Sequence, residues 1–179
     1  MNAPQQDDTG RAEEVILFSG GIDSLGGAVQ ECLQSARKVV LVSHRPVDKV
    51  YSRQRRLATE IASRITDPQR RPFHIAIEVN KGKKLGRDFM QRSRSFLFAA
   101  VAAVVAQALQ LSRIRFYENG VVSLNLPLSP QAIGARATRT THPQVLAGFA
   151  RCKRRSMSRR PSKVCISHWR CSQLRSARS

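Results

Sequence analysis

Cysteine is scarce in this chain and does not occur at the spacing that metal sites use. Its 179 residues include four cysteines, none of them in a Cys-x-x-Cys pair, so a zinc site is not expected. So few cysteines also exclude the dense disulfide framework of small secreted domains. The four positions are Cys32, Cys152, Cys165 and Cys171.

No apolar run is long enough to cross a bilayer. The longest, Phe96–Ala106, has eleven residues, whereas a membrane-spanning helix needs about 20. The N-terminus is polar and acidic and lacks the early apolar stretch of a secretory signal. We therefore expect a cytoplasmic protein with no membrane partner, and we expect Phe96–Ala106 to lie in a buried helix.

Acidic residues are few, at 12 against 31 Lys and Arg, which gives a net charge of +19 and a pI near 11.5. Such a charge suggests a polyanionic partner. Residues 149–179, however, hold ten of the basic residues and none of the acidic ones, so much of the excess belongs to a short tail. The aromatic residues (7 Phe, 2 Tyr and 1 Trp) offer little stacking surface for single-stranded nucleic acid.

The composition divides the chain into three parts. Residues 1–12 are expected to be a disordered N-terminus, residues 13–150 one domain, and residues 151–179 a basic, disordered tail. Three interpretations of the tail stay open. It is an arm that binds nucleic acid, an extension without a role, or the product of a reading frame that shifts near Ala150.

Apolar segments of strand type alternate with segments of helical periodicity. This alternation predicts an α/β fold with a doubly wound parallel sheet, in which the loops after the strands share one edge. The expected strands are Val15–Phe18, Lys38–Ser43, Pro72–Val79 and Ile114–Tyr117, and the expected helices are Ser24–Ala36, Lys49–Thr66 and Ser93–Leu111.

The most informative segment, Ser19–Ser24, joins the first strand to the first helix. Its two glycines let the backbone approach an anion, and the free N–H groups of a helix N-terminus would bind phosphate. Asp23 would repel a bare phosphate but suits a site where Mg²⁺ bridges the carboxylate and the phosphate oxygens. The alternative is a glycine turn that only packs the helix against the sheet.

The loop is not a Walker A motif, since no Lys-Ser or Lys-Thr follows its glycines. The Ser-Gly-Gly-Ile-Asp-Ser segment instead resembles the PP-loop of the N-type ATP pyrophosphatases. Over Val15–Phe149 the chain is similar to the 7-cyano-7-deazaguanine synthase (QueC-like) branch, and most to its anti-phage (QatC-like) variant. Besides the loop, the segments that carry this resemblance are Arg92–Phe98, Glu118–Gly120 and Ala132–Pro143.

The resemblance implies an adenine nucleotide alpha hydrolase-like (HUP) fold and an ATP-dependent ligase. ATP would adenylate a carboxylate on a deazapurine-like substrate, pyrophosphate would leave, and ammonia would attack. Ser19, Gly20, Gly21, Ile22 and Ser24 would hold the pyrophosphate, while Asp23 would bind Mg²⁺. Proteins of a defence cassette are the implied partners.

The resemblance also assigns residues outside the loop. Ser43 and His44 would lie near the adenosine, and Arg94 would contact phosphate or the substrate carboxylate. The residues that would face the second substrate are Asn119, Arg136, Arg139 and Thr141. Three of them have a plainer alternative: His44 as a loop or core histidine, Arg94 as a solvated cation, Thr141 as a helix cap.

Two departures from the family weaken the assignment of a complete activity. The four-cysteine zinc site of the queuosine-pathway enzyme has no counterpart here, and no fifth strand is evident, so the sheet is expected to be incomplete at the C-terminus. Two other functions therefore remain open. The chain is a basic protein that binds nucleic acid, or a non-catalytic subunit that keeps the fold.

Overall fold

The chain forms a parallel sheet with helices on both faces. The computed structural model describes residues 12–45, 47–79, 94–119, 147–148, 151 and 163–169, with the backbone alone for 94, 118–119 and 163–169. Strands lie in the order β3-β2-β1-β4-β5, and each neighbouring pair is parallel. Their bounds are β1 Glu14–Leu17, β2 Val39–His44, β3 Phe73–Ile77, β4 Arg113–Asn119 and β5 Lys163–Trp169.

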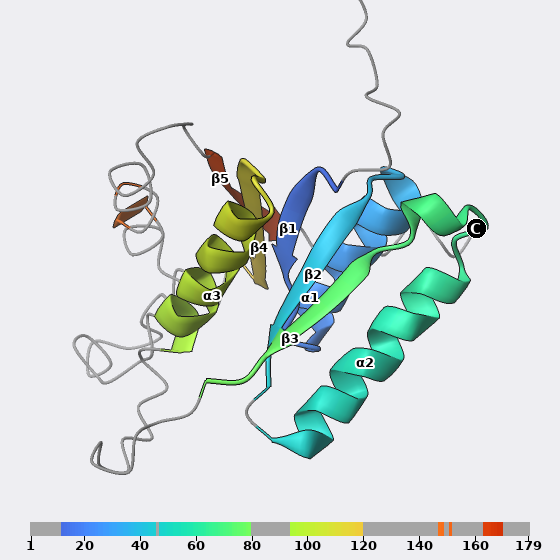
Figure 1. Ribbon diagram of the computed structural model, residues 1–179, viewed down its shortest axis with the longest axis horizontal. Coiled ribbons are helices and arrows are strands. Elements are labelled where there is room, and N and C mark those ends of the chain that lie inside the picture. The colour runs from blue at the N-terminus through green and yellow to red at the C-terminus, as the bar shows by residue number, and fades with distance from the viewer. Residues whose placement is uncertain are drawn as a thin grey trace, which may run out of the picture.

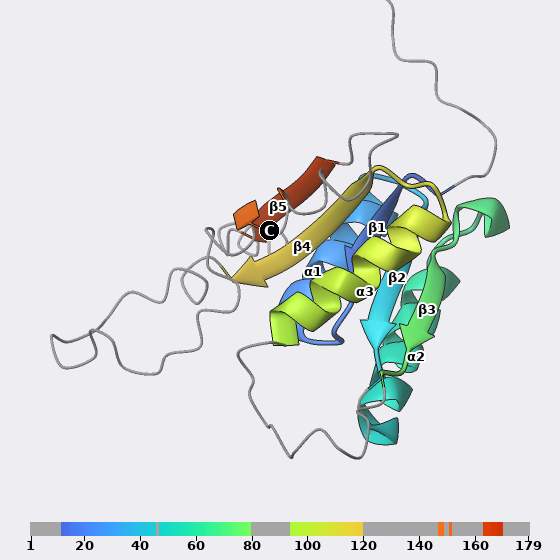
Figure 2. The ribbon, with the colours of Figure 1, turned by 60° about the vertical axis from the view of Figure 1, so that its left-hand side comes forward.

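Helix α3 covers one face of the sheet, and α1 and α2 cover the other (Figures 1 and 2). This arrangement confirms the predicted α/β class and doubly wound sheet. The chain leaves β1 on one side towards β2 and returns on the other side at β4, so the sheet has a topological switch point at the carboxyl end of β1. The helices are α1 Ile22–Val29, the π-helical turn η1 Gln30–Gln34, α2 Asp48–Ser63, the 3₁₀ turn η2 Pro68–Arg70 and α3 Arg94–Ala108.

Alternate residues of the strands point to opposite faces, which produces two apolar layers. Val15 and Leu17 face α3, whereas Ile16 and Phe18 face α1 and α2. All four are buried, as the continuous apolar run of a central parallel strand predicts. Among the described residues, no helix is long and apolar enough to cross a membrane.

Strand β5 lies in the segment where the sequence predicted a disordered tail and no fifth strand. It pairs with β4 from Arg113 beside Lys163 to Asn119 beside Trp169. The expectation of no fifth strand is thus wrong, because Val164 and Ile166 give a short β-type alternation that the surrounding Arg and Ser obscure. The division of the chain into a domain and a basic tail stays a prediction. Residues 1–11, 152–162 and 170–179 lie outside the described residues.

Helix α3 is less buried than its composition predicts. Ala99, Ala102 and Ala106 pack on the sheet, as expected for an apolar helix. Phe96 and Val104, however, are 61% and 65% exposed. The prediction of burial therefore fails for the outer side of α3, because a single helix on a sheet buries only the stripe that faces the strands.

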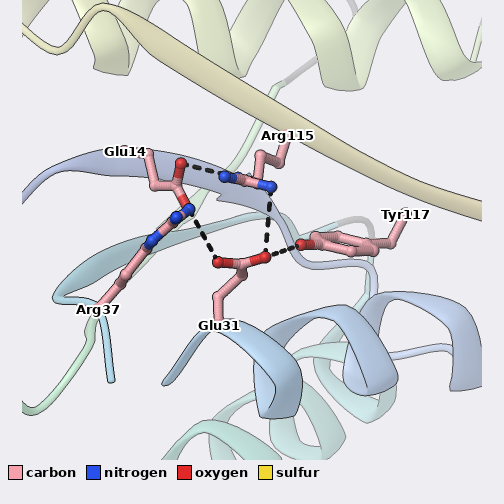
Figure 3. A network of polar contacts seen from close by, with 5 residues as sticks. All are labelled: Glu14, Glu31, Arg37, Arg115 and Tyr117. Carbon is pink, nitrogen blue, oxygen red and sulfur yellow. Dashed lines mark hydrogen bonds and ion pairs between the residues drawn. The ribbon is translucent and has the colours of Figure 1, made fainter. Parts of the chain in front are cut away.

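A network of buried charges connects the starts of β1 and β4 with η1 (Figure 3). Arg115 donates to Glu14 over 2.7 Å and lies 3.3 Å from Glu31, while Arg37 lies 3.2 Å from Glu31 and 3.5 Å from Glu14. Tyr117 completes the network by donating its hydroxyl to Glu31. Both carboxylates are almost fully buried, so the two arginines are needed to compensate for their lost hydration.

Burial and the charges of the network together shift the pKa values of Arg115 and Cys32. Burial disfavours the charged form of Arg115, but the contacts with Glu14 and Glu31 outweigh this effect and raise its pKa. Burial, with a smaller contribution from Glu31 and Glu14, raises the pKa of the Cys32 thiol to about 12. Cys32 is therefore an unreactive thiol at neutral pH.

We predict that Glu31→Gln lowers the free energy of unfolding by about 3 kcal/mol, because it leaves the cations of a buried pair only partly compensated. The matched control is Glu60→Gln on α2. Glu60 also pairs with an arginine, Arg64, but both side chains are more than half exposed, so the cost should stay below about 0.5 kcal/mol. Urea denaturation measures both values, and equal costs would contradict the structural importance of the buried network.

Candidate functional site

The candidate site is the turn that leaves the carboxyl end of β1 and opens α1. Gly20 has φ +78°, a left-handed conformation that favours glycine. The Ser19 and Ser24 hydroxyls lie 3.1 Å apart, Ser19 Oγ accepts from the Gly21 N–H over 3.3 Å, and Ser24 donates to the Gly21 carbonyl over 3.0 Å. The two serines therefore hold the turn in a defined shape.

The N-terminus of α1 lies open behind this turn. Gly21 occupies the N-cap position, and no side chain of the described residues caps the helix. Gly21 is exposed, and Ile22 is 82% exposed. The start of the helix therefore lies at the surface, and its first N–H groups carry the positive end of the helix dipole.

Gln54 of α2 holds the turn through hydrogen bonds, a role that the sequence did not predict. Its side chain is fully buried, and Nε2 donates to the Ser19 carbonyl over 3.1 Å and to the His44 carbonyl over 3.2 Å. This amide fixes the ends of β1 and β2 relative to each other. A Cβ on Gly20 would stand 3.0 Å from Gln54 Cγ, so the close approach also favours glycine there.

A pocket of about 250 Å³ opens beside the turn, at the switch point between β1 and β4. Open α/β sheets bind ligands in this crevice. Ser19, Ser24 and Ser95 supply hydroxyl groups to its lining, and Leu17, Phe98 and Phe116 supply apolar surface. The lining residues are Leu17, Ser19, Ser24, Ser95, Phe98, Phe116 and Tyr117.

Ser43 does not contact this pocket. It is fully buried, and its hydroxyl donates to the Phe18 carbonyl over 2.6 Å and lies 2.9 Å from His74 Nε2. The Ser43 hydroxyl has one proton, and it donates this proton to the Phe18 carbonyl. His74 Nε2 is therefore the donor to Ser43 Oγ and cannot act as a general base towards this serine. The Ser43 hydroxyl is thus engaged inside the fold and is not activated as a nucleophile by His74. The expected place of Ser43 near an adenosine stays a prediction.

His44 lies at the end of β2, as predicted, and is partly buried. Its ring meets Phe98 of α3 edge-on, with 5.7 Å between centroids. Phe98 in turn lines the pocket. His44 therefore packs next to the candidate site through Phe98, and its place near an adenosine stays a prediction.

Asp23 projects from the first turn of α1 and is partly exposed. Within the described ranges, no group of three or more His, Cys, Asp and Glu side chains could hold a metal by itself. Mg²⁺ is commonly bound by one or two carboxylates together with substrate phosphates. Asp23 suits such a shared site, in which the phosphates supply the remaining ligands.

The remaining predicted residues fall at or beyond the limits of the described structure. Arg94 is the first residue of α3 and Asn119 the last of β4, and only their backbones are described. Both backbones lie at the ends of elements that flank the pocket. Arg136, Arg139 and Thr141 lie outside the described residues.

Three contributions to the site were missed by the sequence reasoning. Gln54 precedes Leu57, Ala58 and Ile61 on the apolar stripe of α2, so a buried amide could have been read from its helical spacing. Ser95 and Tyr117 line the pocket because α3 begins and β4 ends there, which only the tertiary structure shows.

No family model matches this sequence, and no curated protein matches it. Among solved structures, the chain is similar to a universal stress protein whose crystal structure was determined in complex with cAMP. The two share 12% sequence identity with a TM-score of 0.46, and the alignment covers 89% of this chain and 98% of the other.

We predict that His74 makes folding stability depend on pH. Burial lowers the pKa of His74 below its usual value of 6.5, so the unfolded chain binds a proton more readily than the folded one. The contribution of His74 to the free energy of unfolding should be constant above this value and should fall as the pH falls below it. Urea denaturation at pH 7.5 and 5.5 should show a smaller loss for His74→Gln than for the wild type, and parallel losses would contradict the prediction.

Proposed function

We propose that the protein binds ATP with Mg²⁺ at the Ser19–Ser24 turn and uses it to activate a carboxylate. The observation that carries the proposal is the uncapped, exposed N-terminus of α1 at the switch point of the sheet. This position concentrates free N–H donors and a positive dipole end where ligands of α/β sheets bind.

The surroundings of the turn support a phosphate chain as the ligand. The Ser19 and Ser24 hydroxyls add donors at the pocket, and Gly20 and Gly21 keep side chains away from the backbone. Asp23 in the same turn favours a phosphate that arrives with its metal ion over a bare one. When bound, Mg²⁺ would withdraw charge from the departing pyrophosphate.

The reaction class rests on the resemblance of Ser19–Ser24 to the PP-loop. In that reaction a carboxylate oxygen of the substrate bonds to the α-phosphorus, the bond between the α-phosphorus and the bridging oxygen breaks, and pyrophosphate leaves. Ammonia then bonds to the acyl carbon and AMP leaves. The backbone N–H groups of the turn would stabilise the charge that grows on the pyrophosphate.

The acceptor that we propose is a deazapurine-like carboxylic acid, or another target modified in anti-phage defence. This assignment depends on the similarity to the 7-cyano-7-deazaguanine synthase branch. Phe98 and Phe116, which line the pocket, would suit a flat ring.

We predict that Asp23→Asn weakens the binding of ATP in Mg²⁺ by about tenfold or more, because the metal loses its carboxylate ligand. In EDTA the variant should match the wild type or bind slightly better, since a repulsive charge is removed. Isothermal titration calorimetry measures both conditions.

The matched control is Asp67→Asn. Asp67 accepts from the Gln69 N–H in an exposed cap of η2, and the asparagine can keep that bond. Its affinity for ATP should equal that of the wild type. An unchanged affinity of Asp23→Asn in Mg²⁺ would contradict the metal assignment, and a wild type that binds no ATP would contradict the proposed function.

A further inference from the structure

A row of cations runs along α2 next to the candidate site. Lys49, Arg53 and Arg56 follow the spacing of one helical stripe, and all three side chains are exposed. They line a surface hollow of about 470 Å³ together with Val50 and Ser52. Over seven residues the stripe is about 10 Å long, which suits several phosphate groups better than one.

The acidic residues of α2 do not neutralise this stripe. Asp48 pairs with Arg45 over 2.6 Å, and Glu60 pairs with Arg64 over 2.9 Å. Among the described residues, no ion pair joins Lys49, Arg53 or Arg56 to a carboxylate. Like charges three and four residues apart destabilise a helix, so the stripe leaves a repulsion that an anion would relieve.

Arg53 connects the stripe to the Ser19–Ser24 turn. Its Nε lies 3.8 Å from the point where a Cβ on Gly20 would stand. The neighbouring residue, Gln54, donates to the Ser19 carbonyl and so fixes this part of α2 against the turn. The two cationic features, the guanidinium of Arg53 and the free N-terminus of α1, therefore lie side by side.

We infer that Lys49, Arg53 and Arg56 form a second half of the phosphate site, which receives the outer phosphates of a polyphosphate chain held by the turn. The ligand class is a polyphosphate, as in a nucleoside triphosphate. A monophosphate would contact the turn but would not extend to the stripe. This inference rests on the proposed function for its position. Arg53 would bind phosphate through a charge-assisted pair, and Lys49 and Arg56 would add attraction along the stripe.

The test measures the binding of tripolyphosphate, ATP and AMP, each with Mg²⁺, by isothermal titration calorimetry. Arg53→Ala should weaken tripolyphosphate and ATP by about tenfold, and Lys49→Ala and Arg56→Ala by about threefold each. AMP should lose less affinity than tripolyphosphate and ATP in Arg53→Ala, and none in Lys49→Ala and Arg56→Ala. Alanine is the best helix former at these exposed positions, so the fold should persist, which circular dichroism checks.

The matched control is Arg55→Ala. Arg55 is exposed on α2 but does not line the hollow, and its loss should change each affinity by less than about twofold. The inference is overturned if Arg53→Ala binds tripolyphosphate as Arg55→Ala does. It is also overturned if the stripe binds a single-stranded oligonucleotide but not tripolyphosphate.

The outcomes separate the two proposals. A wild type that binds ATP while Arg53→Ala is unaffected overturns the inference and supports the proposed function. A wild type that binds tripolyphosphate through Arg53 but binds no ATP supports the polyphosphate site and overturns the proposed function. Binding of neither compound overturns both.

Discussion

The contact between Gly27 of α1 and the ring of Tyr117 on β4 fixes the distance between α1 and the sheet. A Cβ on Gly27 would stand 2.0 Å from the ring, so helix and strand meet without space for a side chain. Tyr117 also donates to Glu31 in the buried network and lines the pocket beside Ser24. One side chain thus ties the buried charges to the candidate site, and it sets α1 so that its open N-terminus faces the switch point.

The buried polar groups have different structural roles at the two ends of the strands. Near their starts, Arg115 pairs with both Glu14 and Glu31, which stabilises the fold and leaves these charges little freedom to act on a ligand. At their carboxyl ends, Gln54 and Ser43 bind main-chain carbonyls and hold the loops in place. Gly21, Ile22 and the cations of α2 remain exposed there, which suits the proposed anion site.

Much of the fold could be predicted because its signals are local. The run Val15–Phe18, the glycines of the turn and the apolar spacing of α2 each specify their element without reference to the rest of the chain. Strand β5 could not be predicted, since its few β-branched residues do not specify a strand by themselves and adopt one by pairing with β4. The internal hydrogen bonds of Ser43 could not be predicted for the same reason. Its place after an apolar strand suggests a ligand contact, and only the position of Phe18 and His74 shows that its hydroxyl is used inside the fold.

The proposed nucleotide site depends on the main chain at the start of α1. An NMR titration of the ¹⁵N-labelled protein with ATP and Mg²⁺ measures this binding residue by residue. The amide signals of Gly20, Gly21, Ile22 and Asp23 should move together and saturate at one stoichiometric equivalent. If these amides stay unmoved while signals elsewhere in the chain respond, the main chain of this turn does not bind the nucleotide.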